Sequence, residues 1–111
     1  MKIVKTTWFP FGSYDSMAMF PFVFIKGDVK PVVINHEKIH IEQQKELWLV
    51  GFYVLYVYFF AKFFLLYLFH GDKSCWDNAY YSNPFECEAY DNQRNNEYIN
   101  IRQKFYWKKY L

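Results

Sequence analysis

The chain has 111 residues, enough for one hydrophobic core and too few for a catalytic domain with a separate substrate domain. We therefore expect a single domain over residues 1–111. The formal net charge is only +2, which argues against an electrostatic nucleic-acid binder. Aromatic residues make up 25% of the chain, more than so small an interior needs, so part of this aromatic surface is expected to face a partner or lipid.

The cysteines and the N-terminus bear on the cellular compartment. The chain has two cysteines, Cys75 and Cys87, whereas a secreted scaffold held by disulfides normally has more. No apolar stretch ending in a small-residue cleavage site is evident at the N-terminus, so no removable signal peptide is expected. We predict two free thiols and a cytoplasmic protein, with membrane association left open by the apolar composition.

The first third of the chain is predicted to form strands. Residues 1–34 contain glycines and prolines among aromatic and β-branched residues, a pattern typical of short strands and turns. The expected strands cover about 2–8, 17–26 and 31–34, and a glycine-aspartate pair between the last two suits a hairpin turn. A small antiparallel sheet is expected from this arrangement.

A helix that opens with an HExxH motif is predicted next, from His36 to about Leu49, with Asn35 as its N-cap. His36 and His40 are four residues apart, so their imidazoles project from one helical face and can converge on one metal ion. Glu37 can act as general base toward a metal-bound water without coordinating the metal. This pattern is typical of a catalytic Zn²⁺ site, which needs a third protein ligand.

The segment 47–69 is strongly apolar and contains one charged residue, Lys62. It is long enough for a membrane-spanning helix, but tyrosines are spread along it, and tyrosine prefers the membrane interface to the hydrocarbon centre. Apolar residues cover every face of the predicted helix, which excludes an ordinary surface helix. Three interpretations compete: a transmembrane helix, a helix buried in the protein or in a homodimer, and a helical hairpin broken at Gly51.

The last third of the chain is predicted to be helical. Pro84 precedes a helix-compatible run from Phe85 to about Asn95. The stretch 97–111 predicts a basic amphipathic helix, which binds an anionic membrane surface or packs on the core. The expected fold class is α+β, with a small N-terminal antiparallel sheet followed by helices that include a long apolar helix or helical hairpin.

Two motifs together resemble a known family. Residues 85–90 read F-E-C-E-A-Y and contain the E-x-x-A pattern in which glutamate zincins carry their third ligand on a second helix. The pairing of HExxHxxQQ with F-E-x-E-A-Y across an apolar stretch is similar to short bacterial zincin-like metallopeptidases of about this length, of the gluzincin type. The resemblance spans nearly the whole chain. It implies a minimal zincin-like fold, with Glu86 as the third zinc ligand.

The resemblance gives Glu88 a supporting role, in which it orients a histidine or balances charge, although the two glutamates could exchange roles. Thermolysin-type zincins have an acid four residues after the third ligand, and this chain has Tyr90 there. Tyr90 and Tyr98 are candidates for stabilising a developing oxyanion. Gln43 lies on the metal-facing side of its helix and is expected to be exposed, with hydrogen bonding to a ligand or substrate as the alternative.

The metal site limits how the apolar segment can fold. If residues 36–69 formed one straight helix, its end would lie about 50 Å from its start, at roughly 1.5 Å per residue. The chain from Phe69 to Glu86 would then have to be almost fully extended to return, and an extended chain cannot recross lipid. We therefore expect the first helix to end near Gly51 and a second helix, about 52–69, to fold back. Supply of Glu86 by a second subunit is the less favoured alternative.

These patterns predict a zinc-dependent peptidase that acts on a peptide or protein substrate, held in extended form against an edge strand at Met17 to Ile25. Two other functions remain open. One is a non-catalytic zinc-binding protein that associates with a membrane or a partner, and the other is hydrolysis of a non-peptide amide by the same chemistry. No nucleic-acid partner is expected, and a homodimer could form through the segment 47–69.

Overall fold

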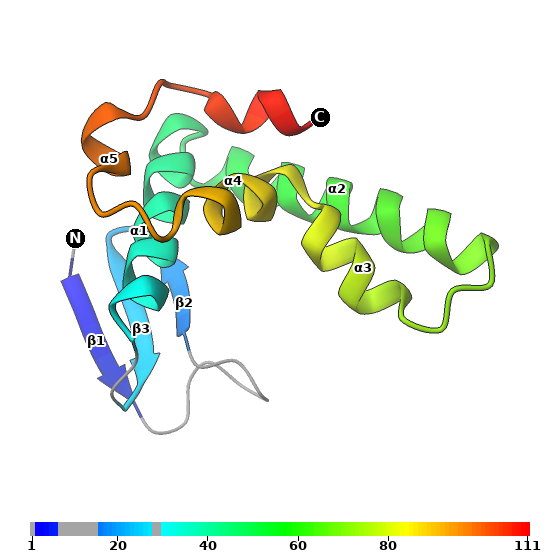
Figure 1. Cartoon of the computed structure of the whole chain (residues 1–111), viewed down its shortest axis with the longest axis horizontal. Helices are drawn as coiled ribbons and strands as arrows, with labels where there is room; N and C mark the ends of the chain where they lie inside the picture. The colour runs from blue at the N-terminus through cyan, green and yellow to red at the C-terminus, as the bar shows by residue number, and fades with distance from the viewer. Residues whose placement is uncertain (1, 7–15, 28–29) are drawn as a thin grey trace.

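The computed structural model describes residues 2–6, 16–27 and 30–111 (Figure 1). Strands come first and helices follow, which confirms the predicted α+β class. The strands are β1 (Lys2–Thr6), β2 (Ser16–Met19) and β3 (Phe22–Lys26). The helices are α1 (Pro31–Glu46), α2 (Val50–Phe69), α3 (Cys75–Ser82), α4 (Pro84–Asn92), α5 (Tyr98–Ile101) and the 3-10 helix η1 (Tyr106–Tyr110).

The sheet is mixed, with the strand order β1-β3-β2. β2 pairs with β3 antiparallel, as predicted, but β1 pairs with β3 parallel, because β2 reverses the chain between them. The strand predicted over 17–26 is two strands, since the chain turns at Phe20 and Pro21. The strand predicted at 2–8 is β1 as far as Thr6, and its last two residues lie outside the described part.

The strand predicted at 31–34 is wrong, because these residues form the first turn of α1, which begins with a proline. Proline suits the first helical position, where its missing N–H would be unpaired and its φ is already helical. Asn35 is therefore inside the helix, and its side-chain amide donates to the carbonyls of Gln93 and Asn95. The hairpin predicted between the second and third strands is also wrong, because β3 is followed by α1 and not by another strand. Residues 28 and 29 lie outside the described part.

α1 is the central helix of the core. Ile41 packs with buried residues of β2 and β3. Ile39 packs with Ala89 of α4 and Tyr98 of α5. Because α1 is covered on several faces, its buried polar side chains find most of their hydrogen-bond partners inside the protein.

The helical break predicted at Gly51 occurs slightly earlier, at Trp48 and Leu49. Both residues have positive φ, 58° and 61°, and they separate α1 from α2. α2 leaves the end of α1 at a steep angle and extends away from the sheet, and α3 runs back beside it (Figure 1). The chain therefore returns to α1 through α3 and α4, whereas the sequence predicts that the second helix itself folds back.

One face of α2 is apolar and exposed. Within this helix Phe52 and Phe59 are the buried residues, and they pack with Phe85 and Trp107. The opposite face exposes apolar side chains at helical spacing, which we call the outer stripe: Val50, Val54, Val57, Tyr58, Leu65 and Leu68. Among the described helices, α2 is the one that is long and apolar enough to cross a membrane.

The amphipathic helix predicted over 97–111 is wrong. The backbone is extended at Arg102, whose guanidinium reaches inward to pair with Glu88 and Glu46. Phe105 then has a left-handed φ of 60°, and the short η1 follows. A long-range ion pair thus interrupts the local helical pattern.

Candidate metal centre

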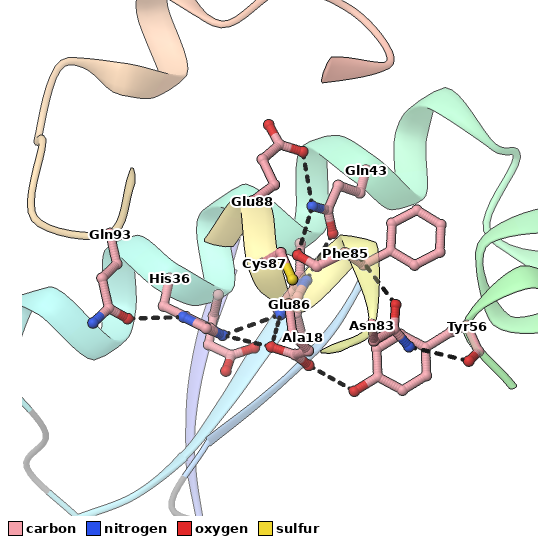
Figure 2. Close-up of polar contacts among 12 residues, drawn as sticks. Ala18, His36, Gln43, Tyr56, Asn83, Phe85, Glu86, Cys87, Glu88 and Gln93 are labelled. Atoms are coloured by element: carbon pink, nitrogen blue, oxygen red, sulfur yellow. Dashed lines mark hydrogen bonds and ion pairs between the residues drawn. The ribbon is translucent and has the colours of Figure 1, made fainter. Parts of the chain in front are cut away.

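α1 and α4 bring two histidines and a glutamate together inside the protein (Figure 2). His36 and His40 lie one turn apart on α1, and Glu86 lies in the first turn of α4. The Nε2 atoms of the histidines are 3.1 Å apart, and each is 3.0 Å from Oε1 of Glu86. All three residues are buried, so these atoms face one another away from bulk water.

The spacing of these atoms suits a metal ion. Zinc binds histidine nitrogen and carboxylate oxygen at about 2.0–2.2 Å, and tetrahedral geometry then separates two ligand atoms by roughly 3.3–3.6 Å. The observed separations of 3.0 and 3.1 Å are slightly shorter than this range. The group formed by His36, His40 and Glu86 could therefore hold a metal ion.

Two glutamines orient the imidazole rings. Oε1 of Gln43 lies 2.7 Å from Nδ1 of His40. Oε1 of Gln93 lies 2.9 Å from Nδ1 of His36 (Figure 2). An amide oxygen can only accept, so each Nδ1 donates, and Nε2 of a neutral ring keeps its lone pair. Two lone pairs and a carboxylate oxygen then point at one another, which is repulsive unless a cation or a proton lies between them.

Glu88 supports the centre from outside it. Its fully buried carboxylate forms a two-pronged pair with Arg102 and accepts from the hydroxyl of Tyr98 and the side-chain amide of Gln43. Because a carboxylate can only accept, the NH₂ group of Gln43 must face Glu88, which turns the amide oxygen toward His40. Of the two glutamates in the motif, Glu86 lies beside the histidines and Glu88 lies outside the cluster.

α2 and α4 fix the position of Glu86. Asn83 caps α4, since its side-chain oxygen accepts from the N–H of Phe85 and its amide donates to the carbonyl of Tyr56. The hydroxyl of Tyr56 donates to Oε2 of Glu86 at 2.6 Å, which leaves Oε1 toward the histidines. Pro84 occupies the first helical position, so α4 begins one residue before the predicted start at Phe85.

Charge couples His40 to Glu86. Burial alone lowers the pKa of His40, but the negative charge and hydrogen bond of Glu86 outweigh it and raise this pKa to about 9. Burial raises the pKa of Glu86, while the charge of His40 and hydrogen bonds from both histidines pull it well below its ordinary value. A proton on His40 therefore relieves the repulsion in the metal-free protein, and a bound metal ion must displace it.

Glu37 lies beside the cluster, at a cavity of about 340 Å³. It is buried on α1, and its Oε1 accepts a hydrogen bond from the hydroxyl of Ser16 at 3.0 Å. His40 and Glu86 line the same cavity. A small molecule in this space would meet the candidate general base and two candidate metal ligands together.

Sequence reasoning missed the importance of two glutamines. Gln43 is expected to be exposed, but it is completely buried between the cluster and Glu88. Gln44 is also buried, and it holds β2 by accepting from the N–H of Phe20 and donating to the carbonyl of Ala18. The signal for both roles is the paired glutamine in HExxHxxQQ, one turn beyond the second histidine.

The remaining candidates lie outside the cluster. Tyr98 donates its hydroxyl inside the core and is not among the described residues that line the cavity. Tyr90 packs edge-on against the ring of His36, with 4.4 Å between ring centroids. Cys75 and Cys87 are free thiols, as predicted.

The chain matches no protein-family model, no curated protein and no solved structure. The resemblance to zincin-like proteins therefore rests on the two motifs, and it stays a prediction. What stands independently is the buried group of two histidines and one glutamate that could hold a metal ion.

Proposed function

We propose that the chain is a zinc-dependent metallopeptidase, in which His36, His40 and Glu86 hold Zn²⁺ and Glu37 is the general base. The observation that carries this proposal is the triangle of two imidazole nitrogens and one carboxylate oxygen, 3.0–3.1 Å apart, beside a cavity that Glu37 lines. Two histidines and a glutamate form a known ligand set of catalytic zinc, which keeps one position open. Structural zinc sites instead use four protein ligands.

Each residue at the centre has a distinct task. Zinc held by His36, His40 and Glu86 would supply a water of lowered pKa and polarise a substrate carbonyl. The carboxylate of Glu37, which the hydroxyl of Ser16 holds in place, would accept a proton from that water. Gln43 and Gln93 keep the Nε2 atoms of the histidines available as ligands by accepting from Nδ1.

The substrate approaches through the cavity, and only part of the predicted edge strand can guide it. Within Met17 to Ile25, β2 lies at an edge of the sheet, whereas β3 is paired on both sides. The carbonyl of Ala18 in β2 already accepts from Gln44 and Tyr53. A peptide that adds to this edge therefore pairs beside Ser16.

The test combines zinc content with cleavage of a quenched peptide library. We expect the wild type to bind about one zinc ion per chain, and His36→Ala and Glu86→Ala to lose it. Glu37→Gln should keep zinc and lose cleavage, whereas Glu42→Gln, which removes a carboxylate from the same helix, should keep both. A wild type that binds no supplied zinc, or a Glu37→Gln variant that cleaves at the wild-type rate, contradicts the proposal.

The outer stripe of α2 favours a second function, a non-catalytic zinc-binding protein that uses this face to bind a membrane or a partner. Extended apolar patches are rare on monomeric soluble proteins. The same experiment separates the two functions, because zinc that depends on His36 and Glu86 without any cleavage by wild type supports the non-catalytic one. Substrates with non-peptide amide bonds, tested in parallel, detect the third alternative.

A further inference from the structure

The cavity beside the candidate metal centre has a chemistry that selects among substrates. We propose that it binds one bulky apolar side chain of the peptide, next to the bond that is cleaved. This inference rests on the proposed peptidase function and adds a substrate class to it.

Five elements form the cavity, and its polar and apolar parts are separate. The floor carries the side chains of Glu37, His40 and Glu86. β2 supplies Met17 and Ala18 on one wall. α2 and α3 supply the other walls, which are mainly aromatic: Phe52, Tyr53, Tyr56, Val57, Phe60 and Trp76. A side chain between these walls lies directly beside the candidate reaction centre.

Two tyrosine hydroxyls on the walls are engaged within the protein. The hydroxyl of Tyr53 donates to the carbonyl of Ala18, and the hydroxyl of Tyr56 donates to Glu86. None of the described residues that line the cavity is a lysine or an arginine. The carboxylates of Glu37 and Glu86 lie on the floor, where the cleaved bond would sit. A charged side chain held between the walls would therefore lose its water without gaining a partner there, whereas an apolar side chain gains free energy from burial.

The size of the cavity restricts the ligand. Its volume of about 340 Å³ lies at the lower end of the range for small-molecule sites, roughly 300–1,000 Å³. This space fits one or two side chains and no folded element. Burial of a large apolar side chain typically changes affinity by about 10- to 100-fold, which sets the selectivity to be measured.

Two valines on α2 provide a matched pair of variants. Val57 lines the cavity and is 63% exposed, so a larger residue there narrows the opening without disturbing the core. Val54 is 62% exposed on the same outer stripe but is not among the described lining residues. Val57→Trp and Val54→Trp therefore add the same bulk to the same helix face, and only the first adds it to the cavity.

The test measures binding of blocked amino-acid amides to the full chain by NMR, with and without zinc, through the indole N–H signal of Trp76. The probes are the N-acetyl amides of phenylalanine, leucine, aspartate and lysine. We expect the apolar amides to bind about 10-fold more tightly than the charged ones. Val57→Trp should weaken this binding about 10-fold, and Val54→Trp should leave it unchanged. Library cleavage sites should show a large apolar residue beside the cleaved bond.

Three results overturn the inference. The first is equal binding of apolar and charged amides, and the second is an equal loss of binding in the two tryptophan variants. The third is efficient cleavage without any apolar preference beside the cleaved bond, which leaves the peptidase function intact. If zinc-loaded wild type cleaves no peptide, the proposed function fails, and the binding comparison still decides whether the cavity takes an apolar side chain.

Discussion

Gln43 provides the sharpest test of how the candidate metal centre is held. Its amide oxygen accepts from Nδ1 of His40 at 2.7 Å, and its amide nitrogen donates to Glu88 and to the carbonyl of Phe85 at 2.9 and 3.0 Å. Gln43→Leu approximately preserves the size of the side chain and removes all three hydrogen bonds. His40 can then carry its proton on either ring nitrogen, so Nε2 is no longer reserved for a metal.

The expected loss of zinc affinity is about 10- to 100-fold, the usual effect of removing a hydrogen-bond partner of a metal-binding histidine. This corresponds to about 1.4–2.7 kcal/mol of binding free energy. The free energy of unfolding should also fall by about 1–3 kcal/mol, because Nδ1 of His40 is left buried without a partner. A stability loss alone does not indicate a metal role, so a matched control is needed.

Gln44 supplies that control, because it is the neighbouring buried glutamine and it bonds β2 instead of a histidine. Gln44→Leu should lower the free energy of unfolding by a similar amount, about 1–3 kcal/mol, and leave zinc affinity unchanged. The assay is competition for zinc with a chromophoric chelator, together with urea unfolding of the metal-free proteins. Wild-type zinc affinity in Gln43→Leu, or equal losses of affinity in both variants, would refute the reasoning.

Buried charges and the outer stripe give three further expectations. The pKa of His40 is raised from 6.5 to about 9, so its stabilisation of the metal-free protein is complete below pH 6.5 and lost as pH rises through about 9. Zinc binding at neutral pH should therefore release about one proton, measurable by calorimetry in buffers of different ionisation enthalpy. Arg102→Ala should lower the free energy of unfolding by about 3–5 kcal/mol, because buried Glu88 loses its cation. Val54→Lys with Leu65→Lys should abolish flotation with lipid vesicles, since both charges fall on the outer stripe.

Each of these expectations has a control or a contrary outcome. A metal-free protein that is as stable above pH 9 as below pH 6.5 contradicts the raised pKa of His40. Arg94→Ala is the control for Arg102→Ala. Arg94 is exposed, so its replacement should change the free energy of unfolding by less than about 0.5 kcal/mol. Asn100→Lys adds a charge at an exposed position of α5, away from α2, and should leave vesicle binding intact. If the chain forms a dimer in the absence of lipid, and Val54→Lys with Leu65→Lys dissociates that dimer, the outer stripe mediates self-association.

The sequence predicts the features that follow from helical periodicity and chain length. Two histidines four apart share a helix face whatever the rest of the fold does. The need to bring Glu86 back to them predicts a break in the long helical pattern, and a break is observed. The break lies at Trp48 and Leu49, and neither residue is a glycine or a proline. The sequence pattern therefore points to the nearby Gly51 instead.

Features set by tertiary contacts are not visible in the sequence pattern. Glutamine is mostly a surface residue, and the burial of Gln43 follows only from the position of Glu88 on a separate helix. The stretch 97–111 has helical periodicity, yet the buried ion pair between Glu88 and Arg102 takes precedence over it. Residues 31–34 are rich in β-branched side chains, but packing within α1 determines their conformation.

α2 connects the apolar surface of the chain to its candidate metal centre. Its inner face supplies Tyr56, whose hydroxyl holds Glu86, and Phe52, whose ring centroid lies 6.1 Å from that of His40. Its outer stripe shares Val57 with the wall of the cavity. Whatever covers the stripe therefore lies beside the cavity entrance, and a lipid surface there would place apolar segments of a substrate next to the site. Under the proposed function, a surface that covers the outer stripe would therefore influence which substrates reach the site.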